Sequence, residues 1–503
     1  MVTCNELYST LMERMAELSD LSATMALLSW DQETYMPAGS QQARALQSST
    51  LSAISHQRFT DPAVGDLLKR LQADTPPDVK DQRIAVDRVA WEYERATKIP
   101  ESLVREMAQA QSDSVAAWSA AKEKDDFPTF QPHLEKLLEL ERQYADCLKR
   151  DGQSRYDVLV EGYERGMTRD KISTIFTNLR EWLAPFVQEI ANSKNPVDAS
   201  CLAQPFDEDK QWEFGLRILK DMGFDFDHGR QDRSAHPFTN GFHPQDVRIT
   251  TRINPNHLSP GLFATIHEGG HALYEQGFDP NDYRGPLASS ISLGIHESQS
   301  RMWENMVGRS MPFWKHYYAS LQETFPQLKD ISLDAFYRAA NQVQPSLIRV
   351  EADEVTYSLH IILRFELEQA LLDGELPPAD LPGIWREKMK EYLGIEPEDD
   401  RTGCLQDIHW AWGLVGYFPT YTLGNLYAAQ MFETARKEIP NLEEHIAKGE
   451  LLVLKDWLRE KVHRVGNRRL ADELVEDITG RAPEAKPYME YIEKKFGAIY
   501  GIR

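Results

Sequence analysis

Apolar side chains recur every three to four positions along most of this 503-residue chain, a spacing that predicts amphipathic helices. The pattern fills residues 5–149 in stretches of about 12 to 25 residues that end at Pro, Gly or Asp. It continues over 169–192 and 207–222, and it resumes after residue 259. We therefore predict a predominantly all-α protein.

One segment departs from this pattern, between residues 223 and 255, where Gly, Pro, Asn and His predominate. Apolar and polar residues alternate over 247–253, which predicts a strand and hence a small β ribbon. We interpret residues 1–503 as a single domain. Its expected parts are an N-terminal helical part (1–222), a loop and β ribbon (223–258) and a second helical part (259–503) that carries the motif described below.

Composition and charge narrow the class of function. Lys and Arg total 56 against 79 Asp and Glu, a net charge of −23, so neither nucleic acid nor an anionic membrane is an expected partner. The uncharged stretch 410–432 is long enough to span a bilayer, but it contains Pro419 and several polar residues, and we interpret it as buried protein. The absence of a signal pattern in the first residues and of any CxxC pair among the four cysteines indicates a cytoplasmic protein with reduced thiols.

The strongest chemical motif is HExxH, formed by His267, Glu268 and His271. Ser259 and Pro260 suit the N-cap and first turn of a helix, which places both histidines on one face where their imidazoles can reach one metal ion. Glu268 lies beside that face and can take a proton from a metal-bound water. The alternative is an amphipathic helix with two histidines on its polar side.

A catalytic zinc site needs a third protein ligand. The position six residues after the second motif histidine is Gly277, which excludes the longer motif with a third histidine there. A Glu on a second helix is the usual solution, and the helical stretch 294–307 offers Glu297. We choose Glu297 over Glu304 and Asp279, although a solvated helix face would explain any single Glu equally well.

A polar stripe is predicted on a third helix. Helical spacing over 346–372 predicts a long and largely buried helix on which four polar residues share a face, namely Arg349, Asp353, Thr356 and His360. A buried Arg needs a partner. Arg349 either pairs with Asp353 as a structural ion pair, which the pattern alone favours, or binds an anionic ligand.

Four polar residues in the region 403–421 stand in otherwise uncharged sequence, namely Gln406, Asp407, His409 and Tyr421. They are typical of a cavity lining, in which His409 and Tyr421 can donate hydrogen bonds to an oxyanion beside a metal. A satisfied polar network in the core explains the same residues, and the pattern alone favours that interpretation.

Together these motifs resemble the carboxypeptidase Taq family of metallocarboxypeptidases, over nearly the whole chain. The shared segments are LSWDQET at 28–34, HPF at 236–238, DxRxT at 246–250, HExxH at 267–271, HES at 296–298, IRxxAD at 348–353 and GxxQDxHW at 403–410.

The resemblance implies a nearly all-α fold with a deep active-site groove, similar to that of HExxH oligopeptidases, and a homodimer. It implies one Zn²⁺ per chain, replaceable by Co²⁺, with Glu297 as the third ligand. The implied activity is release of C-terminal amino acids from short peptides with broad specificity, C-terminal Pro being disfavoured. Arg349 then holds the terminal carboxylate of the substrate. The other implied substrate-binding residues, some of them near the blind end of the groove, are His236, Asp246, Arg248, Asp353 and Gln406.

We therefore expect a zinc metallocarboxypeptidase in which Glu268 is the general base and then the acid, while His409 and Tyr421 stabilise the oxyanion. An oligopeptidase of the same fold that cuts internally is the first alternative. A catalytically silent scaffold with a structural metal is the second, and Glu268 argues against it because a structural site has no use for that side chain.

Overall fold

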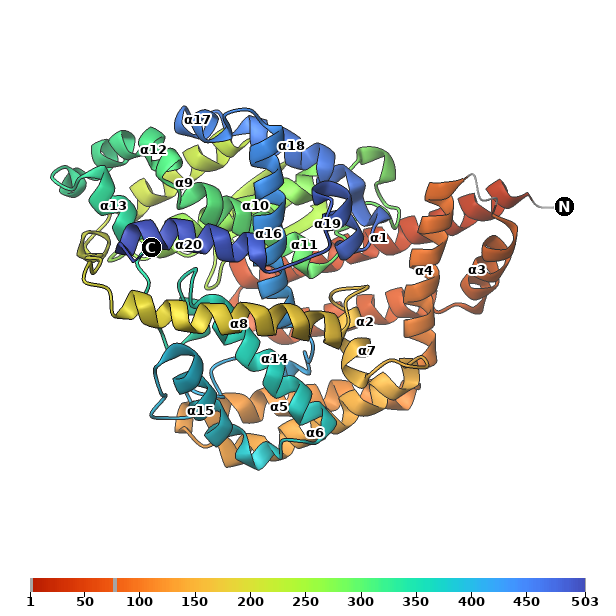
Figure 1. Ribbon diagram of the computed structural model, residues 1–503. Coiled ribbons are helices and arrows are strands. Elements are labelled where there is room, and N and C mark those ends of the chain that lie inside the picture. The colour runs from red at the N-terminus through yellow and green to blue at the C-terminus, as the bar shows by residue number, and fades with distance from the viewer. Residues whose placement is uncertain (1–2, 76–78, 503) are drawn as a thin grey trace.

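The computed structural model describes residues 3–75 and 79–502, which form a helical body with one small sheet (Figure 1). The helices before the sheet are α1 (Cys4–Thr34), α2 (Gln41–Phe59), α3 (Pro62–Asp74), α4 (Lys80–Lys98), α5 (Glu101–Lys124), α6 (Phe127–Leu148), α7 (Arg155–Glu161), α8 (Arg169–Ala191) and α9 (Glu208–Met222). Those after it are α10 (Leu258–Gly277), α11 (Leu293–Arg301), α12 (Met311–Thr324), α13 (Leu333–Ala340), α14 (Tyr357–Asp373), α15 (Leu381–Leu393), α16 (Pro419–Glu438), α17 (Leu442–Ala447), α18 (Leu452–Lys461), α19 (Ala471–Thr479) and α20 (Lys486–Tyr500). The predicted all-α class with a small β element is confirmed.

Local sequence signals set several helix boundaries. At the start of α9, the Asp207 carboxylate accepts the backbone N–H of Lys210 at 3.0 Å, and the helix ends at Gly223, whose φ of 90° suits only glycine well. α8 and α9 thus occupy the predicted segments 169–192 and 207–222 to within a residue.

The sheet contains three strands in the order β1-β3-β2. They are β1 (Gly229–Arg233), β2 (Phe238–His243) and β3 (Asp246–Thr251), with β1 parallel and β2 antiparallel to β3. The predicted strand at 247–253 corresponds to β3. The pattern did not predict β1 and β2, because GRQDR and FTNGFH lack apolar alternation and depend on pairing with β3.

Buried apolar side chains form two clusters. The main cluster fills the body around α14 and α16, whose residues are mostly buried. The smaller cluster joins α1, α3 and α4, and its buried residues are Leu7, Leu11, Met15, Val64, Leu68, Leu71, Val86 and Val89. We call α1–α4 the N-terminal lobe. In Figure 1 its helices α3 and α4 project at the N-terminal end, while the second half of α1 continues to the sheet and contacts β2.

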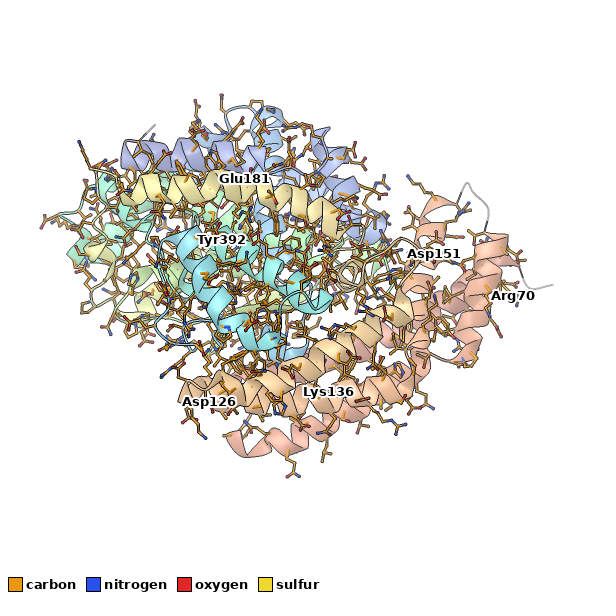
Figure 2. The ribbon with its side chains drawn as sticks, turned by 60° about the horizontal axis from the view of Figure 1, so that its bottom comes forward. Arg70, Asp126, Lys136, Asp151, Glu181 and Tyr392 are labelled. Atoms are coloured by element: carbon orange, nitrogen blue, oxygen red, sulfur yellow. The ribbon has the colours of Figure 1, made fainter. Side chains whose placement is uncertain are left out.

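Charged side chains lie mostly on the outer surface, because burying an unpaired charge is costly. Figure 2 shows Arg70, Lys136 and Glu181 on the outer faces of their helices. Within residues 3–75 and 79–502, no helix is long and apolar enough to cross a membrane. The uncharged stretch 410–432 instead lies largely buried, mostly in α16, as predicted, and all four cysteines are free.

The predicted helix over 346–372 is wrong in its first third. Only a short 3-10 turn, η6 (Arg349–Glu351), precedes α14, which begins at Tyr357. Asp353 explains the late start, because its carboxylate accepts the backbone N–H groups of Val355 and Thr356 at 2.9 and 3.0 Å. Both residues precede α14, so these bonds hold the chain in a turn until Tyr357, where the helix begins. Arg349 and Asp353 therefore do not share a helical face.

Candidate active site

The two motif histidines and Glu297 converge from two helices, α10 and α11. The Oε2 atom of Glu297 lies 3.4 Å from Nε2 of His271 and 3.7 Å from Nε2 of His267. All three ligand atoms lie within 4.8 Å of one another. Two imidazole nitrogens and one carboxylate oxygen in this arrangement are the donors of a catalytic zinc site, which keeps a fourth position open. The residues therefore fit a metal ion.

The other nitrogen of each imidazole is already engaged. Nδ1 of His267 lies 2.9 Å from the carboxylate of Glu304, and Nδ1 of His271 lies 2.5 Å from Nδ1 of His296. His296 in turn contacts Glu275 through Nε2 at 2.8 Å. These contacts fix the two rings with Nε2 facing Glu297, as outer partners of metal-binding histidines commonly do. Glu304, which we weighed as the third ligand, thus orients His267.

Asp279, the other residue considered as third ligand, does not join the cluster. It precedes the short turn η3 (Pro280–Asp282) and accepts the backbone N–H of Asn281 at 2.9 Å. Sequence reasoning did not identify His296 and Glu275 as partners of His271, since their pairing depends on how α10 packs against α11.

Close helix packing places Glu297 over the HExxH motif. Gly270 lies so near α11 that a Cβ atom there would be 2.7 Å from the carbonyl oxygen of Gln299, and Gly424 on α16 approaches the Glu297 side chain equally closely. Any larger residue at either position would push α11 outward. After Arg301, α11 widens into the π-helix η4 (Met302–Gly308), which carries Glu304. Such π-helical turns are frequent at functional sites.

Arg301 fixes the ionisation and orientation of Glu297. Its Nε donates to Oε1 of Glu297 at 2.7 Å, which leaves Oε2 for the metal position. Burial opposes ionisation, yet Arg301 and the neighbouring His267 hold the pKa of Glu297 well below its usual range. The carboxylate is therefore charged, as a metal ligand must be.

Glu268 is held by the sheet. The Thr239 hydroxyl on β2 donates to Oε2 of Glu268 at 2.6 Å. Glu268 is only 6% exposed, and this burial raises its pKa despite the opposing effects of His267 and Thr239. A carboxylate with a raised pKa is a better proton acceptor near neutral pH. Thr239 was not among our predicted site residues, and no motif singles it out.

The N-cap of the motif helix also differs from the prediction. α10 begins at Leu258, and the ring of His257, rather than the side chain of Ser259, accepts a backbone N–H at this end, from Ser259 at 3.3 Å. The helix thus begins two residues earlier than predicted, and the spacing of the two motif histidines is unchanged.

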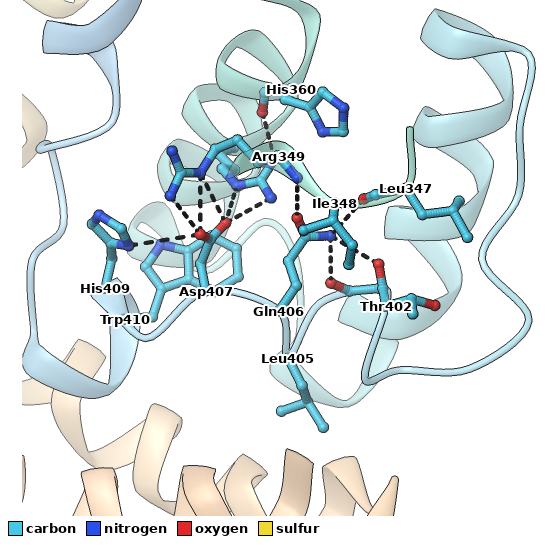
Figure 3. Close-up of polar contacts among 12 residues, drawn as sticks. Leu347, Ile348, Arg349, His360, Thr402, Leu405, Gln406, Asp407, His409 and Trp410 are labelled. Atoms are coloured by element: carbon cyan, nitrogen blue, oxygen red, sulfur yellow. Dashed lines mark hydrogen bonds and ion pairs between the residues drawn. The ribbon is translucent and has the colours of Figure 1, made fainter. Parts of the chain in front are cut away.

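Arg349 pairs with Asp407, not with Asp353. Nε and Nη2 of Arg349 donate to Oδ1 of Asp407 at 3.1 and 2.8 Å (Figure 3). Nε of Arg364 donates to Oδ2 of the same carboxylate at 2.7 Å. Arg349 is 6% exposed and Arg364 is fully buried. The two arginines hold the pKa of Asp407 far below its usual range, although burial opposes this. Two cations share one anion, so the cluster keeps one positive charge.

Gln406 and Asp353 both hold backbone in place beside this cluster. Oε1 of Gln406 accepts the backbone N–H of Arg349 at 2.8 Å, and its Nε2 donates to the carbonyl of Leu347 at 3.0 Å (Figure 3). Asp353 accepts the backbone N–H of Gln344 at 3.0 Å in addition to its contacts at the start of α14. Both side chains therefore position the segment that carries Arg349.

Tyr357 connects the Arg349 cluster to the metal-binding residues. The guanidinium of Arg301, which binds Glu297, lies 4.5 Å from the centre of the Tyr357 ring. The hydroxyl of Tyr357 accepts a hydrogen bond from Nη1 of Arg349 at 3.0 Å. The two groups of side chains thus form one continuous site.

His409 and Tyr421 lie between these groups. Nε2 of His409 is 3.4 Å from the Tyr421 hydroxyl, and the Tyr421 ring centre lies 5.2 Å from the Arg349 guanidinium. Burial, together with Arg349, lowers the pKa of His409 to about 4, so its ring is neutral at physiological pH. Burial raises the pKa of Tyr421 and the nearby Glu297 carboxylate adds to this effect, so Tyr421 keeps its proton and can donate it in a hydrogen bond.

The DxRxT residues lie on β3, and the HPF residues lead into β2, which begins at Phe238 and carries Thr239. Arg248 forms two hydrogen bonds with Asp246, at 2.9 and 3.0 Å, and its guanidinium lies 4.4 Å from the centre of the Trp30 ring at the end of α1. His236 is exposed. Arg248 pairs across the sheet with Asn240, the neighbour of Thr239, so its side chain lies on the face of the sheet toward α1, opposite the face on which Thr239 meets Glu268.

Comparisons with known proteins match this chain to one family of metallopeptidases over nearly its full length. The family model for carboxypeptidase Taq (M32) metallopeptidases matches residues 10–496. Thermostable carboxypeptidase 1 of Thermus thermophilus is 44% identical, covering 98% of this chain and 99% of the relative, and carboxypeptidase 1 of Bacillus subtilis is 39% identical, covering 97% of each. The crystal structure of an M32 carboxypeptidase from Deinococcus radiodurans superposes with a TM-score of 0.95 at 40% identity, covering 98% of this chain and 99% of the other.

The fold, the convergent HExxH and Glu side chains and these matches define a metallopeptidase, which implies a metal cofactor and hydrolysis of peptide bonds. The chain belongs to the carboxypeptidase Taq (M32) family.

Proposed function

We propose that this protein is a zinc metallocarboxypeptidase that removes C-terminal residues from short peptides, with broad specificity and with C-terminal Pro disfavoured. His267, His271 and Glu297 would hold one Zn²⁺ per chain, and Co²⁺ would replace it. The bound metal would supply Lewis-acid activation of the attacking water and of the scissile carbonyl. The observation that carries the proposal is the continuous site that joins these ligands, through Arg301 and Tyr357, to a cationic cluster at Arg349.

Glu268 performs the proton transfers in this proposal. Its carboxylate accepts a proton from the water that attacks the carbonyl, and it then gives this proton to the amine that leaves. The hydroxyl of Thr239 donates to Oε2, which leaves the other oxygen of Glu268 for these proton transfers. Tyr421 and His409 then supply hydrogen-bond donors for the oxyanion, as neutral groups that keep their protons.

Arg349 binds the terminal carboxylate of the substrate. The cluster of Arg349, Arg364 and Asp407 carries a net charge of +1, since one carboxylate faces two guanidinium groups. A free peptide carboxylate neutralises this charge, whereas a C-terminal amide does not. Asp407 binds Nε and Nη2 of the Arg349 guanidinium, and Nη1, which faces Tyr357, forms no bond with Asp407.

The proposal is tested with two peptides of one sequence, one with a free C-terminus and one with a C-terminal amide. We expect the kcat/KM for the free peptide to exceed that for the amide by about 10²-fold or more, because the amide forfeits a charge-assisted pair. Equal values for the two peptides would instead support an oligopeptidase that cuts internally.

A further inference from the structure

The C-terminal helix α20, which lies against α16 (Figure 1), contacts the π-helix η4 through two polar side chains. The Tyr491 hydroxyl donates a hydrogen bond to the Asn305 carbonyl at 3.0 Å, and Nζ of Lys495 donates to the same carbonyl at 3.2 Å. Asn305 is buried and follows Glu304, whose carboxylate contacts Nδ1 of His267. The two side chains of α20 therefore bind the main chain one residue from the partner of a metal-binding histidine.

Lys495 is held at this position by three acceptors. Its Nζ also donates to Oε2 of Glu354 at 2.6 Å and to the Tyr491 hydroxyl at 3.0 Å. The side chains of Lys495 and Glu354 are 7% and 4% exposed. An ammonium group can donate three hydrogen bonds, and here one of them goes to the Asn305 carbonyl. The attraction within a buried ion pair barely offsets the cost of desolvating both charges, so stability alone does not account for this pair.

The π-helical register explains why the Asn305 carbonyl takes its donors from α20. In an α-helix this carbonyl would accept the backbone N–H of Arg309, four residues further on. Here that N–H bonds to the Glu304 carbonyl at 2.9 Å, which is the spacing of a π-helix. A buried carbonyl without a donor is costly. Removing the donors of α20 would therefore favour an α-helical turn, which would give the Asn305 carbonyl a partner again and shift Glu304 around the helix axis.

We propose that Lys495 and Tyr491 are positioning residues for the metal site, because they keep η4 in its π-helical register and thereby hold Glu304 against His267. The inference rests on the metal site of the proposed function and not on the reaction or its substrate. Oε2 of Glu304 lies 2.9 Å from Nδ1 of His267, so a change of register at the next residue moves the carboxylate away from the ring. Loss of such an outer partner typically weakens metal binding by about 10- to 100-fold.

The affinity of the full-length protein for Zn²⁺, measured by competition with a chelating indicator, tests the proposal. Lys495→Met removes the ammonium group, whereas Tyr491→Phe removes only the hydroxyl. We expect the dissociation constant for Zn²⁺ to rise about tenfold or more in Lys495→Met and about threefold or more in Tyr491→Phe. The visible absorption spectrum of the Co²⁺-loaded variants should also change, because it reports the geometry of the ligands around the ion.

Tyr488→Phe is the matched control on the same helix. Tyr488 is buried one turn before Tyr491, and its hydroxyl donates at 2.8 Å to the carbonyl of Glu354 instead of Asn305. The substitution therefore removes one hydrogen bond of similar length from α20 and none from η4. We expect Tyr488→Phe and Tyr491→Phe to lower the melting temperature by similar amounts. The dissociation constant for Zn²⁺ should change less than about twofold in Tyr488→Phe.

Two results would overturn this proposal and leave the proposed function standing. One is an unchanged Zn²⁺ affinity and Co²⁺ spectrum in Tyr491→Phe, which removes a single oxygen atom and so remains informative if Lys495→Met does not fold. The other is an equal loss of affinity in Tyr488→Phe, which would make the effect one of general packing. Absence of metal binding to the unaltered protein would contradict the metal site itself, and would overturn both this proposal and the proposed function.

Discussion

Replacing Thr239 by Val should shift the pH dependence of catalysis. Thr239 donates to the Glu268 carboxylate at 2.6 Å, and this hydrogen bond lowers the pKa of Glu268 against the effect of burial. Valine keeps the shape and removes the donor, so the protonated form of Glu268 becomes relatively more stable. A hydrogen bond to a charged acceptor contributes about 1.5 kcal/mol or more, and about 1.4 kcal/mol corresponds to one pKa unit. The pKa of Glu268 should therefore rise by about one unit.

The sign of the effect on activity follows from the role of Glu268. Only the ionised carboxylate can accept a proton, so the acidic limb of the kcat/KM profile should move to higher pH by about one unit. Well above that limb, the variant should approach the activity of the unaltered enzyme. The assay is a pH profile of kcat/KM on one free-carboxylate peptide, with metal content measured at each pH.

Thr251→Val is the matched control, because Thr251 lies on the adjacent strand and is buried, but its hydroxyl contacts the Gly261 carbonyl and Thr265 instead of Glu268. The acidic limb of the kcat/KM profile of Thr251→Val should stay at the pH found for the unaltered enzyme. An unshifted limb in the Thr239 variant, or the same shift in both variants, would refute the assignment of Thr239 as the residue that tunes Glu268.

Three further substitutions separate the roles of the site residues. Glu268→Gln should keep the metal near one equivalent while turnover falls by about 10² to 10⁴, and loss of the metal along with activity would contradict its assignment as base. Glu297→Ala should lose the metal, because two imidazoles alone bind a divalent ion poorly; metal analysis that shows unchanged affinity would contradict the assignment of Glu297 as third ligand. Arg349→Lys should cost about 1.5 to 3 kcal/mol in kcat/KM on free-carboxylate peptides but little on amidated ones, with the metal retained. Parallel losses on both substrates together with earlier melting would make Arg349 purely structural, as its bond to Asp407 alone would suggest.

Local pattern predicted the two motif histidines on one helix, whereas the choice of Glu297 as third ligand depended on the resemblance to the family. The four-residue spacing of His267 and His271, and the helix that carries Glu297, depend on nearby residues only, and the structure brings the three side chains together. The helical array and the strand at 247–253 were predicted for the same reason, since periodicity reports local burial.

The spacing of apolar and polar residues did not predict contacts between segments that are distant in the sequence. Arg349 bonds to Asp407, 58 positions away, whereas spacing suggested its near neighbour Asp353. Asp353 instead accepts the backbone N–H groups of Val355 and Thr356 in the turn just before α14, a role that residue type alone does not distinguish from ion pairing. Thr239 reaches Glu268 from a strand without apolar alternation, so neither its element nor its partner was predicted. Pairings of this kind arise only when the elements pack.

A timed digest of short peptides tests whether the protein is a metal-dependent carboxypeptidase. A mixture of short peptides is incubated with the enzyme, sampled over time by mass spectrometry, and the digest is repeated with a chelator and then with added Zn²⁺. We expect a ladder of products shortened one residue at a time from the C-terminus, its loss with the chelator and its return with Zn²⁺. Internal fragments, or a ladder that persists when metal analysis shows the protein to be metal-free, would contradict it.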